Sequence, residues 1–102
     1  MPGVGKLLKQ AQKMQKAMEN VQSELSSKII EVSSGGGAVK VSVDGHGALK
    51  TLKLDPEFLK EGAEVVESAI LSAINEACDK AKAESEAEMA KITGGFSMPG
   101  LF

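Results

Sequence analysis

Residues 4–25, VGKLLKQAQKMQKAMENVQSEL, carry the pattern that decides the fold. Their apolar side chains recur alternately three and four residues apart, at Val4, Leu7, Ala11, Met14, Met18, Val21 and Leu25. A repeat of about 3.5 residues predicts one long helix, over residues 4–27, that packs lengthwise against another helix. With a rise of about 1.5 Å per residue, this helix is about 36 Å long. The partner helix can belong to the same chain or to a second copy.

The middle of the chain predicts three short strands. Residues 28–33 are rich in β-branched side chains, and residues 39–43 alternate valine with polar side chains. Residues 48–54 place Leu52 and Leu54 on one face of a third strand. Glycine-containing turns over residues 34–37 and 44–47 connect the strands. We therefore expect a three-stranded antiparallel sheet.

A second long helix is predicted over residues 63–92, after a short helical turn that begins at Asp55 and Pro56. Gly94 and Gly95 are typical of a helix end. The apolar stripe of this helix consists of Val66, Ile70, Ala73, Ile74, Ala77 and Ala81. The fold class is thus α+β, in the order α-β-β-β-α. We expect a single domain over residues 1–95, followed by an apolar tail over residues 96–102.

The helix lengths favour an assembly of two chains. A compact domain of this size has a radius of gyration near 13 Å, hence a diameter of roughly 34 Å. The second helix, at about 45 Å, is longer than that. We expect a homodimer with protruding helices, and the alternative is a monomer whose two helices pack antiparallel on the sheet. The side chains expected in the dimer interface or in core packing are Leu7, Met14, Met18, Val39, Val41 and Val43.

Missing residue types exclude several functions. The 102 residues contain no Arg, Trp or Tyr, so bidentate base readout by Arg and base stacking on Trp or Tyr are excluded. One Cys and one His cannot build a structural zinc site, and a single Cys cannot form an intramolecular disulfide. There is no apolar run of roughly 18 residues and no signal-peptide pattern. We expect a cytoplasmic protein without a membrane, metal or cofactor partner.

Charge is distributed unevenly along the chain. Residues 1–18 hold four lysines and no acid, a charge of +4, whereas residues 55–91 hold ten acids and four lysines, a charge of −6. The four lysines are Lys6, Lys9, Lys13 and Lys16, and their spacing places them on one side of the first helix, opposite the apolar seam. This lysine row is about 15 Å long, which matches several phosphate spacings of duplex DNA. Lysine suits backbone contact better than base readout. The alternative interpretation is a solvated helix face.

No residue cluster indicates catalysis. Cys78 has no histidine or basic neighbour to activate it and is expected to be buried. His46 lies between two glycines and is expected to be exposed in a turn. Glu84, Glu86 and Glu88 point in different directions around a helix. The sequence therefore predicts a protein that is not an enzyme.

Several segments resemble one known family. Residues 7–18, LLKQAQKMQKAM, resemble the first helix of the YbaB/EbfC family of bacterial nucleoid-associated DNA-binding proteins. Residues 37–45, GAVKVSVDG, resemble its central strand, and residues 52–56, LKLDP, resemble its strand-to-helix junction. Residues 73–77, AINEA, resemble its last helix, and residues 98–102, MPGLF, resemble its tail. The order and spacing of these segments match over nearly the whole chain.

The resemblance implies a tweezer-like homodimer that is joined through the sheets and binds double-stranded DNA in the nucleoid. Binding with weak sequence preference, mainly through the phosphate backbone, would serve nucleoid organisation or gene regulation. The family's DNA contacts are attributed to the first and last helices, which by position nominates Lys6, Lys9, Lys13, Lys16, Lys80, Lys82 and Lys91. Family members often carry Arg where this chain has Lys50, Lys53, Lys80 and Lys82, and the last helix here is acidic. The alternative function is an adaptor dimer for protein interaction, with little or no DNA binding of its own.

Overall fold

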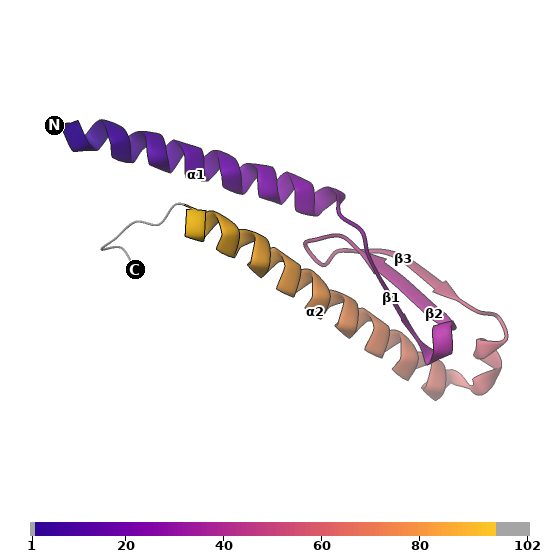
Figure 1. Cartoon of the computed structure of the whole chain (residues 1–102). Coiled ribbons are helices and arrows are strands. Elements are labelled where there is room, and N and C mark those ends of the chain that lie inside the picture. The colour runs from indigo at the N-terminus through magenta and orange to yellow at the C-terminus, as the bar shows by residue number, and fades with distance from the viewer. Residues whose placement is uncertain (1, 96–102) are drawn as a thin grey trace.

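A computed structural model describes residues 2–95 of the chain (Figure 1). The predicted tail over residues 96–102 lies outside this range. The described elements follow the predicted order, and the α+β class is confirmed. They are α1 (Pro2–Ser27), β1 (Ile30–Ser34), β2 (Val39–Val43), β3 (Leu49–Leu54) and α2 (Ala63–Gly95), with single turns of 3-10 helix at Gly35–Gly37 and Phe58–Glu61. The predicted end of the second helix at residue 92 is wrong, because α2 continues through Gly94 and Gly95.

The three strands form one antiparallel sheet in the order β1-β2-β3. Val41 in β2 pairs with Val32 in β1 and with Leu52 in β3, so these side chains share one face of the sheet. A register shift between Ser42 and Val43 interrupts the β2–β3 ladder. The tight turn at residues 44–47 joins these two strands, as the glycines there predict.

Helix α2 covers the inner face of the sheet, mainly over β1 and β2 (Figure 1). The core consists of valine and isoleucine side chains from the two strands and of small side chains from α2, namely Ile30, Val32, Val39, Val41, Val43, Ala73, Ala77 and Ala81. Alanine leaves no long side chain between the two layers, which lets the helix backbone approach the sheet. Strand β3 lies outside this cover, and Leu49 and Leu52 remain exposed.

Helix α1 leaves the sheet and runs antiparallel to the end of α2 (Figure 1). Val21 and Leu25 are buried against Ile92, and Met14, Ala17 and Met89 pack around them. The helices are therefore antiparallel, as in the predicted monomer alternative, but α1 packs on the end of α2 and not on the sheet. The chain is consequently elongated, with a radius of gyration of 19.9 Å and extents of 71 × 23 × 15 Å.

The apolar seam of α1 is covered along only half of its length. Toward the N-terminus, Val4, Leu7 and Leu8 are all more than half exposed. Met18 is exposed as well, whereas Met14 is partly buried. Val39, Val41 and Val43 lie in the core of the same chain.

Candidate nucleic-acid interface

The lysine row lies on the part of α1 that projects away from the sheet. Lys6, Lys9, Lys13 and Lys16 are all exposed. At about 100° per residue, the row points roughly 100° around the axis of α1 from the side chains that contact α2. Within residues 2–95, the ion pairs shorter than 4 Å involve other lysines, so all four ammonium groups of the row are unpaired. They form a continuous positive edge that faces solvent.

The three lysines nominated on α2 do not form a second row. Lys80 and Lys91 are eleven residues apart, which places them on one side of the helix, whereas Lys82 lies on roughly the opposite side. Lys91 also pairs with Glu88, at 3.1 Å between Nζ and Oε1. Acidic side chains surround all three positions, including Glu76, Asp79, Glu84 and Glu86. The positive charge of α2 is therefore dispersed and partly neutralised.

The turn between β2 and β3 holds the C-terminal end of α1. The last carbonyl groups of a helix have no partner within the helix. Here the Gly45 N–H donates to the Leu25 carbonyl at 2.7 Å, and His46 Nε2 lies 3.1 Å from the Gln22 carbonyl oxygen and 3.1 Å from Ser26 Oγ. We refer to residues 44–48 as the capping turn. It fixes the point from which the lysine row projects.

Only glycine fits at position 45 of the capping turn. A Cβ atom there would lie 2.8 Å from Leu25 Cα and 2.7 Å from the Leu25 carbonyl oxygen. Two backbone atoms cannot move aside as the end of a flexible side chain can. The close approach of the turn to α1 therefore depends on the missing side chain.

Asp44 holds the capping turn in shape. Its Oδ1 accepts hydrogen bonds from the backbone N–H groups of His46, at 2.8 Å, and of Ala48, at 3.0 Å. Lys50 Nζ lies 3.6 Å from Oδ2. The hydrogen bond from Ala48 is the largest cause that holds the pKa of Asp44 below its ordinary value of 3.8, and it outweighs desolvation, which acts in the opposite direction. The capping turn is thus stabilised by the ionised form of Asp44.

The structure corrects the prediction for Cys78 and adds a contact at His46. Cys78 is exposed, so its predicted burial is wrong. It follows the buried Ala77 by one residue, which rotates it about 100° away from the sheet. His46 is exposed as predicted, but its contact with Gln22 across 24 residues was not predicted. The glycines on both sides of His46 indicate that another chain segment comes close, but they do not indicate which one.

Among the described residues, no helix is long and apolar enough to cross a bilayer. Within the same residues, no group of three or more potential ligand side chains could hold a metal ion.

Comparison with known proteins decides the family. Residues 1–96 match the YbaB/EbfC DNA-binding family. The chain belongs to this family. Its membership confirms the resemblance seen in the sequence and the expectation of a non-enzymatic protein.

Similar proteins share both sequence and fold. A nucleoid-associated protein of Acetivibrio thermocellus is 47% identical, over 99% of this chain and 95% of its own length. Another, from Caldanaerobacter subterraneus, is 42% identical over 97% of this chain and 90% of its own length. The crystal structure of an uncharacterized protein from Helicobacter pylori superposes with a TM-score of 0.78 at 27% identity, covering 89% of this chain and 94% of that one.

Proposed function

We propose that this protein binds double-stranded DNA mainly through the phosphate backbone, with weak sequence preference, and contributes to nucleoid organisation or gene regulation. The observation that carries the proposal is the row of Lys6, Lys9, Lys13 and Lys16, which is exposed and unpaired within residues 2–95. Lysine contacts phosphate as a flexible point charge and carries little base information. The nucleoid-associated relatives support the same setting.

The absence of arginine indicates that DNA binding depends on phosphate contacts more than on base recognition. Sharp base recognition in the major groove rests most often on bidentate Arg. This chain has none, so its affinity should depend on phosphate neutralisation and thus on salt. If the assembly neutralises about six phosphates, log K falls against log salt with a slope near −5.

We further propose that a second copy covers the exposed apolar side of β3. Leu49 and Leu52 are exposed there, and β3 is an edge strand whose outer ladder is free in the described chain. Cys78 of α2 lies beside the turn between β2 and β3, since its Sγ is 4.0 Å from the Gly47 carbonyl oxygen. Leu71, seven residues earlier, lies on the same side of α2 as Cys78. Leu71, 61% exposed, thus extends the apolar side from β3 onto α2. A mass near that of a single 10.6 kDa chain by light scattering would contradict this dimer.

The test of DNA binding replaces two lysines of the row. The double variant Lys9→Glu/Lys13→Glu should abolish a band shift with duplex DNA, because it reverses charge at the centre of the row. It should leave the light-scattering mass unchanged, because both side chains are exposed. Lys13→Glu alone is compared with Lys60→Glu, which makes the same charge change on the body of the protein.

Equal effects of Lys13→Glu and Lys60→Glu would show that overall charge, and not the row, governs binding. Undiminished binding by the folded double variant would contradict the assignment of the row. If the wild-type chain binds no duplex, the adaptor alternative takes its place. Partners that persist in a pull-down after nuclease treatment would then support the adaptor.

A further inference from the structure

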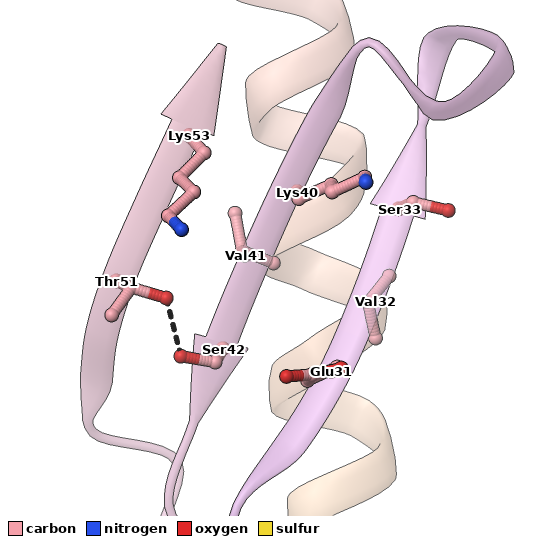
Figure 2. Close-up of a pocket in the computed structure, with 8 residues that line it drawn as sticks. All are labelled: Glu31, Val32, Ser33, Lys40, Val41, Ser42, Thr51 and Lys53. Carbon is pink, nitrogen blue, oxygen red and sulfur yellow. Dashed lines mark hydrogen bonds between the residues drawn. The ribbon is translucent and has the colours of Figure 1, made fainter.

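The sheet has an outer face, opposite α2, that the described chain leaves open. A hollow of about 500 Å³ lies on this face, and Figure 2 shows the side chains from all three strands that line it. We define the outer sheet face by its polar members, Glu31, Ser33, Lys40, Ser42, Thr51 and Lys53. All of them except Ser42 are exposed.

Two lysines lie directly opposite each other on this face. Lys40 in β2 pairs in register with Lys53 in β3. Like charges at directly opposed positions destabilise a sheet. Among the described residues, the ion pairs involve Lys28, Lys50, Lys60 and Lys91, so no carboxylate within 4 Å neutralises either member of the pair. Within residues 2–95, no ion pair offsets this repulsion, and a bound anion would relieve it.

The polar groups around the two lysines suit phosphate. Ser33 pairs in register with Lys40, so one row across the sheet holds a hydroxyl group and two ammonium groups. Figure 2 shows this row at one end of the hollow and Glu31 at the other, beside Ser42, whose hydroxyl is hydrogen-bonded to that of Thr51. A second hollow of about 230 Å³ is also lined by Lys40 and Lys53, together with Asp55, whose carboxylate is not within 4 Å of either ammonium group. Both side chains thus have open space on two sides, and both hydroxyl and ammonium donors bind phosphate oxygens in protein–DNA interfaces.

This face is separate from the lysine row of α1. Helix α1 leads away from the sheet (Figure 1). Lys16, the nearest member of the row, lies eleven residues before the end of α1 at Ser27, which is about 16 Å along the axis. The row extends further from there. A duplex that lies along α1 therefore leaves the outer sheet face free.

We propose that the outer sheet face binds the phosphate backbone of a second DNA duplex, so that the protein bridges two duplexes. This rests on the proposed function in one respect, namely that α1 holds the first duplex. The occupant is DNA rather than a second copy of the chain, because the row of Ser33, Lys40 and Lys53 contains donors and cations only, and because the exposed apolar surface lies on the other side of the sheet.

The test separates binding of the first duplex from capture of the second. Duplex DNA is fixed on beads and loaded with protein, and the retention of a second, fluorescent duplex is measured at 0.1 M salt. A parallel band shift measures affinity for a single duplex. The double variant Lys40→Gln/Lys53→Gln should reduce capture by about tenfold or more, since two phosphate contacts are lost. Its single-duplex affinity should stay within about twofold of wild type, because the row on α1 is intact.

Two further variants sharpen the result. Lys53→Gln is compared with Lys60→Gln, which makes the same change at an exposed lysine away from this face, and only the former should reduce capture. Glu31→Gln removes the single acid of the outer sheet face and should increase capture. An increase there and a decrease at Lys53 cannot both come from a loss of folding.

Each other outcome overturns the bridging proposal. Unchanged capture by the double variant, or no capture by the wild type, would show that the face does not hold a second duplex. An equal loss in both assays would make it part of the first interface, and a change in the light-scattering mass would make it a contact between copies. Failure of the proposed function is seen separately, as band-shift activity that survives in Lys9→Glu/Lys13→Glu.

Discussion

The two halves of α1 share one apolar repeat but differ in what covers it. In the half near the sheet, Val21 and Leu25 are buried against Ile92 of α2, and the Gly45 N–H of the capping turn donates to the Leu25 carbonyl. In the half toward the N-terminus, Val4 and Leu7 of the same repeat remain exposed. Three of the four lysines of the row, Lys6, Lys9 and Lys13, lie on this uncovered half. One half of the helix thus fixes its direction, and the other half presents charge.

The largest expected effect comes from removing the apolar anchor of the covered half. Leu25 is only 2% exposed, so Leu25→Ala should lower the free energy of unfolding by about 2–5 kcal/mol through lost burial and the cavity that remains. Hydrogen exchange should show α1 losing protection before β1 and β2, which have their own core with α2.

Leu7→Ala is the matched control for Leu25→Ala. It makes the same change in the same apolar repeat, at a side chain that is 56% exposed. Its effect on the free energy of unfolding should stay within about 0.5 kcal/mol. Similar losses from the two variants, measured by urea denaturation, would mean that the two halves of α1 are equally covered in solution.

A smaller effect is expected at the capping turn. Gly45→Ala introduces a Cβ atom 2.8 Å from Leu25 Cα and should cost about 1–3 kcal/mol, as overpacking does. The same turn fixes the direction of α1, so the variant should also bind duplex DNA more weakly, although no lysine is changed. A band shift and thermal denaturation measure the two effects.

Gly5→Ala makes the same substitution as Gly45→Ala, but it should change the free energy of unfolding in the opposite direction. Position 5 lies on the uncovered half of α1, and nothing is within 4 Å of a Cβ atom there. Alanine is favoured over glycine in a helix by up to about 1 kcal/mol, so this variant should be slightly more stable than wild type. Destabilisation by Gly5→Ala would indicate that the uncovered half has a close neighbour in solution.

The sequence predicts the elements of this contrast but not the contrast itself. The spacing of apolar residues gives α1, the sheet and α2, because periodicity is a local property. It assigns Leu7 and Leu25 no different fates, because which half is covered depends on where the end of α2 meets α1 in space. His46 illustrates the same limit, since its contact with Gln22 exists only after the turn and the helix are both placed.

The candidate surfaces divide in the same way. Lysines three and four residues apart must share a helix side, so the exposed row on α1 follows directly from the sequence. The candidates on α2, by contrast, rest on the family resemblance alone, and the helix distributes Lys80, Lys82 and Lys91 over two sides. The opposition of Lys40 and Lys53 depends on strand register, which the turn and the irregularity at Ser42 and Val43 set together.

Acid should loosen the capping turn through Asp44. Its pKa lies below the ordinary value of 3.8 in the folded chain, so the ionised group stabilises the fold above its unfolded pKa, and this contribution is lost as the pH falls through the folded pKa. Asp44→Asn lacks the charge at every pH. The urea midpoint should therefore fall less between pH 6 and pH 3 in Asp44→Asn than in wild type. An equal fall in both proteins would show that other carboxylates account for the acid sensitivity.

The smallest effect tests whether the end of α2 adds to the charge presented by α1. Lys91 pairs with Glu88 at 3.1 Å, and the side chain of Lys91 is 72% exposed. Such a pair contributes about 0.5 kcal/mol or less, so Glu88→Gln should leave the free energy of unfolding nearly unchanged. It frees Lys91 and removes an acid from α2. The affinity for duplex DNA should thus rise only slightly if the row on α1 makes most of the contacts. A gain in affinity as large as the loss caused by Lys13→Glu would instead place the end of α2 beside the DNA. In that case the slope of log K against log salt should also steepen by about 0.9, because each phosphate contact contributes that amount wherever it is made.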